Sequence, residues 1–509
     1  MYSGEYNNGK KVGRWVILYK KEEIGGGLYD RSGDEVKVDV WVEIIGSFNS
    51  DSKVTCRGEY RNSKKIGRWD IFHKYEGRNQ KIGGGSYDEQ GDELKIGQWM
   101  EISDFFNNFS QVIYNGLYKN GKKVGYWYIW EQSEGNYERI GGGSYEVSGN
   151  EFKVGRWVET SNNYSDISQV TYKGEYNNGL KIGGWDIWYK YEGKSTKIGG
   201  GQYDESGNEF KLGPWVEISD VFNNFSQVTY NSQYKNDKKV GRWDVWYQQE
   251  GKNEKIGGGS YDELGDELKV GQWVEISNNY RDNSQVTYNG EYNNGIKIGQ
   301  WDIYQRIGFD QPIQKIGGGQ YDNVGHGVKF GQWIELHDEF MNTSQVTFNG
   351  EYRNNRKVNR WDIFFNSNGE NKLIGGGLYD NEEREDLAPG KLGKWIELDY
   401  RFNEYQNQIQ YDRSFQVTHQ GEYKNNKQTD RWDTYFQDRG GSYNENGIKD
   451  GQWGLLTTKF SPYKLTLFLG LFTNGEKVGN WILMNIKIED HYIIFVKIGE
   501  KTYENEKQY

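Results

Sequence analysis

The most regular feature of this chain is an alternation of apolar and polar positions that is interrupted by turn residues and then resumes. Val112, Tyr114, Gly116 and Tyr118 occupy every second position of one such stretch. In the copy at 168–176, the positions between the apolar ones carry Gln, Thr, Lys and Glu. A period of two predicts a β-strand with one buried face.

The turn residues between these stretches predict β-hairpins. Asn120-Gly121 follows the strand that ends at Tyr118, and an Asn-Gly pair favours a tight two-residue hairpin turn. Residues 124–130 then return as a second strand that contains Trp127. We call this unit, in which a Tyr precedes a Trp by nine residues, an A hairpin.

A second unit, the B hairpin, alternates with the first. Its Tyr usually precedes its Trp by twelve residues, as in Tyr87 and Trp99, and its tip is longer and acidic. A and B forms alternate along the chain to give seventeen hairpins, with 58 residues between successive A forms through the middle of the chain. A fixed period of this kind is typical of repeat arrays. We therefore predict an all-β fold, an elongated single-layer antiparallel array of about 17 hairpins. The aromatic residues expected to carry the repeat include Tyr60, Trp69, Tyr87, Trp99, Tyr118, Trp127, Tyr176, Trp185, Tyr203 and Trp215.

The composition agrees with this prediction. The only alanine is Ala388, whereas Gly, Tyr, Asn, Ile and Val are abundant, which favours strands and turns over helices. An aromatic content of 16% is too high for a disordered chain.

Charge and cysteine content narrow the class of protein. The net charge is −11 with no long basic block, which disfavours a nucleic-acid partner because phosphate binding needs clustered Lys and Arg. The lone Cys56 cannot form an internal disulfide, and no apolar signal stretch precedes the first hairpin. No run is long enough for a transmembrane segment. We therefore expect a cytoplasmic protein, in which three glycosylation sequons (at Asn108, Asn163 and Asn224) are recurring turn residues.

The repeated motif resembles a known family. Residues 119–127, Lys-Asn-Gly-Lys-Lys-Val-Gly-Tyr-Trp, are similar to the MORN-type repeat in its Gly-x-Tyr-x-Asn-Gly-x-Lys-x-Gly-x-Trp variant. The resemblance implies a hairpin-repeat sheet, scaffolding through protein–protein contacts and, in some members, association with membrane lipids. Residue usage is typical of an AT-rich protist genome. The chain departs from the motif at Asp39, Asn359 and Asp430, which replace the Gly before the Trp, and at Ser232, which replaces the first Gly.

The glycines within predicted strands need a reason, because Gly weakens a strand. We expect each to provide a flat place on which a neighbouring Tyr or Trp ring lies. The recurring Ile-Gly-Gly-Gly runs, such as 82–85, do not match a phosphate-binding loop, since a Tyr strand follows instead of a helix.

The acidic tips of the B hairpins are the only candidate metal ligands. Clustered carboxylates can bind Ca²⁺, but the EF-hand spacing is absent, so solvated turn residues are the favoured interpretation. In a meander, basic A tips and acidic B tips would alternate along one edge about 10 Å apart, too far for strong attraction. The Ca²⁺ candidates are Asp88, Asp92, Glu93, Asp262, Asp266 and Glu267.

The two ends of the chain differ. Residues 1–481 form the repeat array, and residues 482–509 are predicted to be a non-repeat C-terminal cap. The first strand would then be an exposed edge through which the protein self-associates or adds a partner strand.

No catalytic or cofactor motif is present, so we expect no enzymatic activity and no cofactor. The favoured function is a repeat scaffold with an unidentified protein partner. The alternatives are a ligand-binding module that uses its aromatic rows for carbohydrate or its acidic tips for Ca²⁺, and a lipid-associated protein by analogy with the family. Burial of the aromatic rows would remove the carbohydrate alternative.

Overall fold

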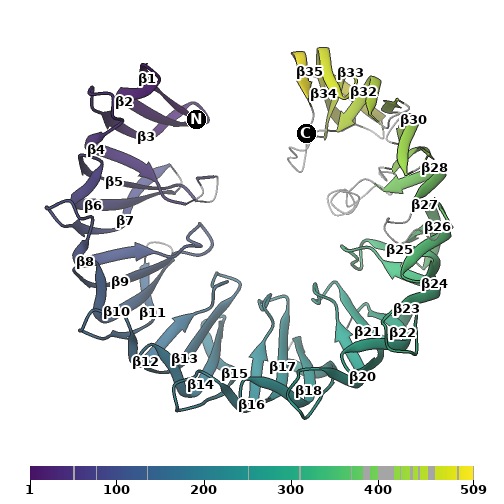
Figure 1. Cartoon of the computed structure of the whole chain (residues 1–509), viewed down its shortest axis with the longest axis horizontal. Coiled ribbons are helices and arrows are strands. Elements are labelled where there is room, and N and C mark those ends of the chain that lie inside the picture. Colours follow the sequence, from purple (N-terminus) through teal and green to yellow (C-terminus); the bar gives the residue numbers. More distant parts are fainter. Residues whose placement is uncertain are drawn as a thin grey trace. The chain divides into compact units, whose positions relative to one another are not determined.

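In the computed structural model, residues 1–509 are described apart from 47, 50–51, 76, 134–135, 250, 309–310, 368, 382–389, 399–417, 425, 436–438, 445–447, 457–464, 490–491 and 508–509. The described residues contain strands and no helix. The chain divides into two units, residues 1–255 with 261–267, and residues 256–260 with 268–509. Strands that follow one another pair antiparallel within each unit, so the predicted hairpin array is confirmed (Figure 1).

The A hairpins pair a first strand with a second strand across a tight turn, with Asn120 and Gly121 both at positive φ (50° and 75°) in one of them, as a type I′ turn requires. Their strands are β1 (Tyr2–Asn7), β2 (Lys10–Tyr19), β5 (Val54–Arg61), β6 (Lys64–Tyr75), β9 (Val112–Lys119), β10 (Lys122–Ser133), β13 (Gln169–Asn177), β14 (Leu180–Tyr191), β17 (Gln227–Lys235), β18 (Lys238–Gln249), β21 (Gln285–Asn293), β22 (Ile296–Arg306), β25 (Gln345–Arg353), β26 (Arg356–Ser367), β29 (Thr418–Lys424), β30 (Lys427–Tyr435), β33 (Leu465–Thr473) and β34 (Glu476–Glu489).

The B hairpins lie between them and have longer tips. Their strands are β3 (Glu22–Tyr29), β4 (Lys37–Ile44), β7 (Arg78–Tyr87), β8 (Lys95–Ile102), β11 (Asn136–Tyr145), β12 (Lys153–Thr160), β15 (Lys194–Tyr203), β16 (Lys211–Ile218), β19 (Lys252–Tyr261), β20 (Lys269–Ile276), β23 (Gln314–Tyr321), β24 (Lys329–Leu336), β27 (Glu370–Tyr379), β28 (Lys391–Leu398), β31 (Arg439–Tyr443) and β32 (Lys449–Leu456). A final strand, β35 (Tyr492–Lys507), follows β34.

The Gly-x-Trp part of the motif is a bulge. Arg57 pairs with Asp70 and Glu59 with Ile66, so three residues of β6 stand opposite Gly58 alone. The first of the three, Gly67, has a φ of 58°, and the third, Trp69, swings its ring over Gly58. A Cβ on Gly58 would lie 2.3 Å from the indole, so only glycine fits beneath the ring.

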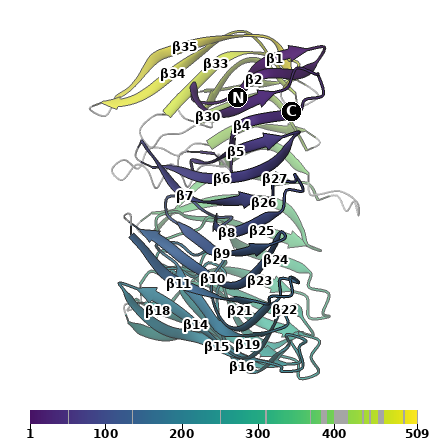
Figure 2. The ribbon, with the colours of Figure 1, turned by 90° about the vertical axis from the view of Figure 1, so that its left-hand side faces the viewer.

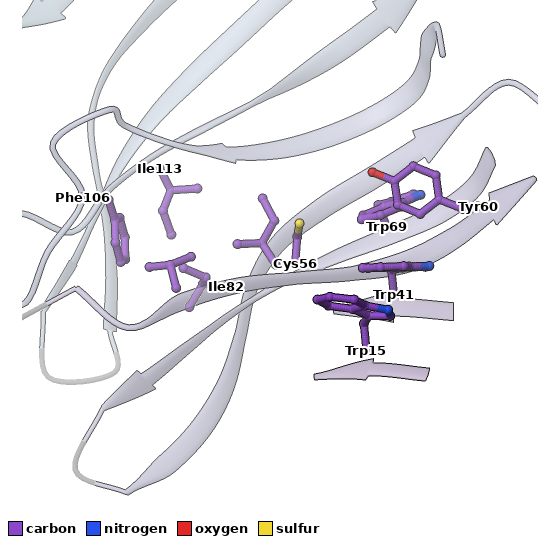
Figure 3. Close-up of a cluster of buried hydrophobic side chains, with 10 residues drawn as sticks. Trp15, Trp41, Cys56, Tyr60, Trp69, Ile82, Phe106 and Ile113 are labelled. Carbon is purple, nitrogen blue, oxygen red and sulfur yellow. The ribbon is translucent and has the colours of Figure 1, made fainter. Parts of the chain in front are cut away.

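The Trp rings of successive bulges and the motif Tyr rings between them form a continuous row. Trp41, Tyr60, Trp69, Tyr87 and Trp99 contact each other in sequence, edge to face, with ring centroids 5.1 to 6.3 Å apart. Edge-to-face pairs add about 0.5–1.5 kcal/mol each beyond the area that they bury. Figure 2 shows β4 to β9, which carry this part of the row, following one another in chain order, and Figure 3 shows three of the Trp rings with the apolar cluster beside them.

The predicted ring-on-glycine contact accounts for only one glycine of the Gly83-Gly84-Gly85 run. Gly85 lies beneath Trp99, where a Cβ would be 2.0 Å from the ring. At Gly83, a Cβ would lie 2.5 Å from the carbonyl oxygen of Met100, while Gly84 has a φ of 127°. The three glycines therefore meet three different requirements. Gly85 leaves room for a ring, Gly83 allows a close backbone approach, and Gly84 adopts a φ that other residues rarely adopt.

Two departures from the motif have physical explanations. Asp39 and Asn359 replace the bulge glycine and keep its positive φ (59° and 57°), which Asp and Asn tolerate better than other residues. Ser232 replaces the glycine beneath Trp243, and the centroids of Tyr234 and Trp243 are 5.7 Å apart instead of the 5.2 Å of Tyr60 and Trp69. The ring has tilted to accommodate one Cβ.

The predicted separation of the hairpin tips is wrong, because neighbouring tips touch. Gly121 of an A tip donates its backbone N–H to Lys95 of the preceding B hairpin, 3.0 Å away. Glu151 of the following B tip accepts from the backbone of Lys123 at 3.0 Å and pairs with Lys122 at 3.2 Å. The prediction considered only the spacing of the strands. The long B loops and the side chains of both kinds of tip extend across that spacing, so neighbouring tips come into contact.

The C-terminal segment keeps the repeat register. Tyr503 of β35 pairs with Gly479, as Tyr87 pairs with Gly67, and its ring contacts Trp481 edge to face at 6.0 Å. The side chains of residues 485–495 lie outside the described set. The expected role of 482–509 in closing the array stays a prediction.

Candidate functional site

Beside the aromatic row, seven repeats hold a carboxylate that accepts a hydrogen bond from a tyrosine and pairs with one or two lysines. Glu101 accepts hydrogen bonds from the Tyr118 hydroxyl (2.9 Å) and from Lys95, and pairs with Lys123 at 3.0 Å. The two ammonium groups lie over the rings of Trp99 and Trp127, at 4.7 and 4.3 Å from the centroids. Equivalent carboxylates are Glu43, Glu159, Glu217, Glu275, Glu335 and Glu397.

The electrostatics of this node are those of a structural anchor. Burial acts to raise the pKa of Glu101, but Lys123 and Lys95 outweigh it and hold the pKa below its usual value. Burial and the Glu101 charge together raise the pKa of Tyr118. These shifts favour a charged Glu101 and a neutral Tyr118, which are hydrogen-bonded to each other.

In the last repeat the carboxylate and the tyrosine are both replaced, while the two lysines remain, as Lys449 and Lys477. Leu455 stands where the carboxylate would be, two residues after Trp453, and Phe472 stands where the tyrosine would be. Loss of the acceptor and loss of the hydroxyl occur together, which agrees with the hydrogen bond being the reason for both.

We expect Glu101→Gln to lower stability at pH 7 by about 1–3 kcal/mol, because two partly buried lysines lose their counter-charge. The folded-state pKa of Glu101 is depressed, so its contribution is present above the unfolded value near 4.5 and is lost as pH falls through the folded value. Denaturant midpoints measured between pH 7 and pH 3 should fall less steeply for the variant than for the parent. Parallel profiles would contradict the assignment.

Four of the six Ca²⁺ candidates, the side chains of Asp88, Glu93, Asp262 and Glu267, accept hydrogen bonds from backbone N–H groups of the hairpin tips. Asp88 accepts backbone N–H groups from Gln90, Asp92 and Leu94, at 2.6 to 3.1 Å. Glu93 accepts from the backbone of Lys65 and pairs with Lys64. In the later copy, Asp262 accepts from the backbones of Leu264, Gly265 and Asp266, and Glu267 accepts from Lys239. Nowhere in the described part of the chain do three metal-ligating side chains converge.

The motif tryptophans offer no open ring face. The Trp side chains at 69, 99, 127, 185 and 215 are no more than 5% exposed. A sugar needs an accessible ring face for stacking, so the carbohydrate alternative loses the surface on which it depended. Cys56 is buried on the same face, and burial raises the pKa of its thiol, so it is not an activated nucleophile.

The loops that join B hairpins to A hairpins form a second, distinct layer of contacts. Each described loop of this kind places an aromatic plug against the preceding A hairpin. Phe106, labelled in Figure 3, is one of these plugs, and it meets His73 edge to face at 5.2 Å. In the next copy Tyr164 donates its hydroxyl to the buried Glu131 at 3.0 Å. Burial raises the pKa of Glu131, while Tyr164 stabilises its charged form.

Successive loops also bond directly to each other, 58 residues apart in the first unit. Ser110 and Ser168 donate their buried hydroxyls to the carbonyls of Tyr164 and Phe222, at 2.5 and 2.6 Å. The backbone N–H of Asp166 donates to Phe109 at 3.1 Å. These bonds hold the loops at 103–111, 161–169 and 219–227 as one stacked edge, which we call the loop edge.

The loop edge exposes apolar side chains that the fold does not use. Phe105 and Phe109 are each 62% exposed, and Ile167, Val221 and Phe225 between 46% and 58%. The three loops also carry exposed aspartates, one each at 104, 166 and 220, and contain no lysine or arginine. An ordered apolar and acidic edge of this kind is typical of an interaction surface.

Sequence reasoning missed this edge, although a signal was present. The position of Phe106 is aromatic in each later copy through Phe340, whereas the neighbouring position of Phe105 holds Asn, Val, Asn and Glu. Comparison of the copies thus separates the buried plug from the exposed ring. Two of the sequon residues bond the next loop: Ser110 donates to the carbonyl of Tyr164, and Asn163 donates to the carbonyl of Asp220 at 2.7 Å.

Comparisons with known proteins do not assign the chain: no family model matches it, and no curated protein is detectably related. A helix of membrane-spanning length and apolarity does not occur among the residues that the structure describes.

Proposed function

We propose that this protein is a non-enzymatic repeat scaffold that binds a protein partner along the loop edge of its first unit. The observation that carries the proposal is the set of solvent-exposed apolar side chains on loops that are rigidly bonded to each other. Burying such residues against a partner stabilises a complex by about 25 cal/mol for each Å² removed from water. The resemblance of the motif to MORN-type repeats supports the same function.

The charge of the loop edge defines the partner. Asp104, Asp166 and Asp220 flank the apolar residues without a basic residue in the same loops. A partner segment that carries apolar side chains flanked by Lys or Arg matches both features, because complementary charge raises association rates and excludes acidic competitors.

Phe109→Asp combined with Phe225→Asp should abolish partner binding, because two charges replace exposed rings at the same position of two loops. Thr343→Asp is the matched control, since Thr343 holds the same exposed loop position in the second unit. The measurement is carbodiimide cross-linking of the purified full-length chain in extract, followed by mapping of the linked residues. Cross-links from partner lysines to Asp104 or Asp220 that disappear in the double variant and persist in the control support the proposal. Cross-links that map elsewhere, or that survive the double change, contradict it.

A further inference from the structure

The second unit contains a groove that the loop-edge proposal does not use. The strands β23 and β24 pair only near their tip, from Gly318 opposite Ile334 to Tyr321 opposite Lys329. Below Gly318, β23 pairs with β22 alone and the end of β24 pairs with β25 alone. The hairpin therefore splays, and a cavity of about 880 Å³ lies there.

One wall of the groove is an open strand edge. Gln314, Lys315 and Ile316 line it, and the ladder with β24 does not reach them, whereas Gly317 lies against the carbonyl oxygen of Ile334. Half of the backbone N–H and C=O groups of a strand point to each side, so those facing β24 in this segment meet no strand. An open edge of this kind binds an extended peptide by strand addition.

The other walls are neutral and polar. Eight amide side chains line the groove, and the single cation, Lys315, is paired with Asp302 at 2.7 Å. The Oδ1 atom of Asn349 is buried in this lining without a hydrogen-bond partner. A buried acceptor without a donor is costly, and Asn349 lines the groove, where a bound ligand can supply that donor. The eight amides are Gln300, Gln314, Gln320, Gln332, Gln345, Asn349, Asn366 and Asn371.

We propose that this groove binds an extended, uncharged peptide segment rich in amide and hydroxyl side chains, by strand addition to residues 314–316. The uncharged lining selects against acidic and basic segments, because a charge there would be desolvated without a counter-charge. A neutral oligosaccharide fits less well, since Trp333 in the lining is 5% exposed and offers no stacking face. This site is independent of the loop edge, which belongs to the first unit.

The test uses a fluorescein-labelled, end-blocked octapeptide of alternating threonine and glutamine, with anisotropy measured on the full-length chain. We expect binding that is at least tenfold weaker for Asn349→Leu, which is about 1.4 kcal/mol. Asn289→Leu is the matched control: Asn289 holds the same repeat position, also has a buried Oδ1 without a partner, and lies outside the groove lining. Bound peptide should slow hydrogen exchange at residues 314–316.

Three results would overturn the proposal. An octapeptide N-methylated at alternate residues that binds as tightly as the parent would rule out backbone pairing. Equal loss in Asn349→Leu and Asn289→Leu would mean that the variants act through stability. Binding of a neutral β-glucan hexasaccharide, with loss in Asn349→Leu and no binding of the peptide, would assign the groove to carbohydrate. None of these results depends on Phe109 or Phe225, so the loop-edge proposal stands or falls separately.

Discussion

Gly174→Val should destabilise the first unit by about 3–4 kcal/mol. A Cβ at Gly174 would lie 2.2 Å from the indole of Trp185, and three ring atoms fall within 2.5 Å. The ring cannot withdraw freely, because it also contacts Tyr176 and Tyr203, with centroids at 5.2 and 6.2 Å. Overpacking in a well-packed site costs about 1–3 kcal/mol for small insertions, and a branched side chain against two rings exceeds this range. Urea denaturation followed by Trp fluorescence measures the loss.

Gly184→Val on the neighbouring strand is the control for this change. Gly184 is exposed, and a Cβ there would make only an ordinary contact, 3.6 Å from Gln202. The expected change is within about 0.5 kcal/mol. Ser232 shows that the site can accommodate a single Cβ when the ring tilts. The serine hydroxyl also gains a hydrogen bond there, because its Oγ donates to the carbonyl of Trp215 at 3.1 Å. Equal effects of the two valines would mean that the ring-on-glycine contact does not limit the fold.

The parts of this fold that the sequence predicts are those set by local pattern. A period of two locates the strands, and Asn-Gly pairs locate the A turns, because both depend only on residues adjacent in the chain. The contact between Gly58 and Trp69 was also predictable, since a glycine repeated in a strand needs a close neighbour. The repeat then extends each local result to every copy.

The parts that escaped prediction depend on how residues far apart in sequence meet. No local signal shows that the loop at 103–111 bonds to the loop 58 residues later, or that Glu151 reaches Lys123. The sequence also does not show that β23 and β24 separate below Gly318, because the three glycines at that point contact three different neighbours. Both candidate sites belong to this second class. The loop edge consists of apolar surface that the repeat leaves exposed, and the groove is bordered by backbone that the ladder between β23 and β24 does not reach.

Trp185→Ala should cost about 3–5 kcal/mol, as expected for removal of a large buried aromatic. The side chain is 3% exposed, and its loss opens a cavity beside Gly174 and interrupts the aromatic row between Tyr176 and Tyr203. In a repeat array each unit relies on its neighbours, so the effect should spread to adjacent hairpins before distant ones.

Trp188→Ala is the control for this variant, because Trp188 lies on the same strand three residues later, is only partly buried and is outside the row. Its partner is Lys173, whose ammonium group lies 4.1 Å from the ring centroid, and a cation–π contact at a partly exposed site contributes about 0.5–1 kcal/mol. Hydrogen exchange resolved by strand should show faster opening of β13 to β16 in Trp185→Ala, with β5 to β8 unchanged, and little change anywhere in Trp188→Ala. If the two variants open the same strands to the same extent, the aromatic row is not the main source of coupling between hairpins, and the stacked loops would have to supply it.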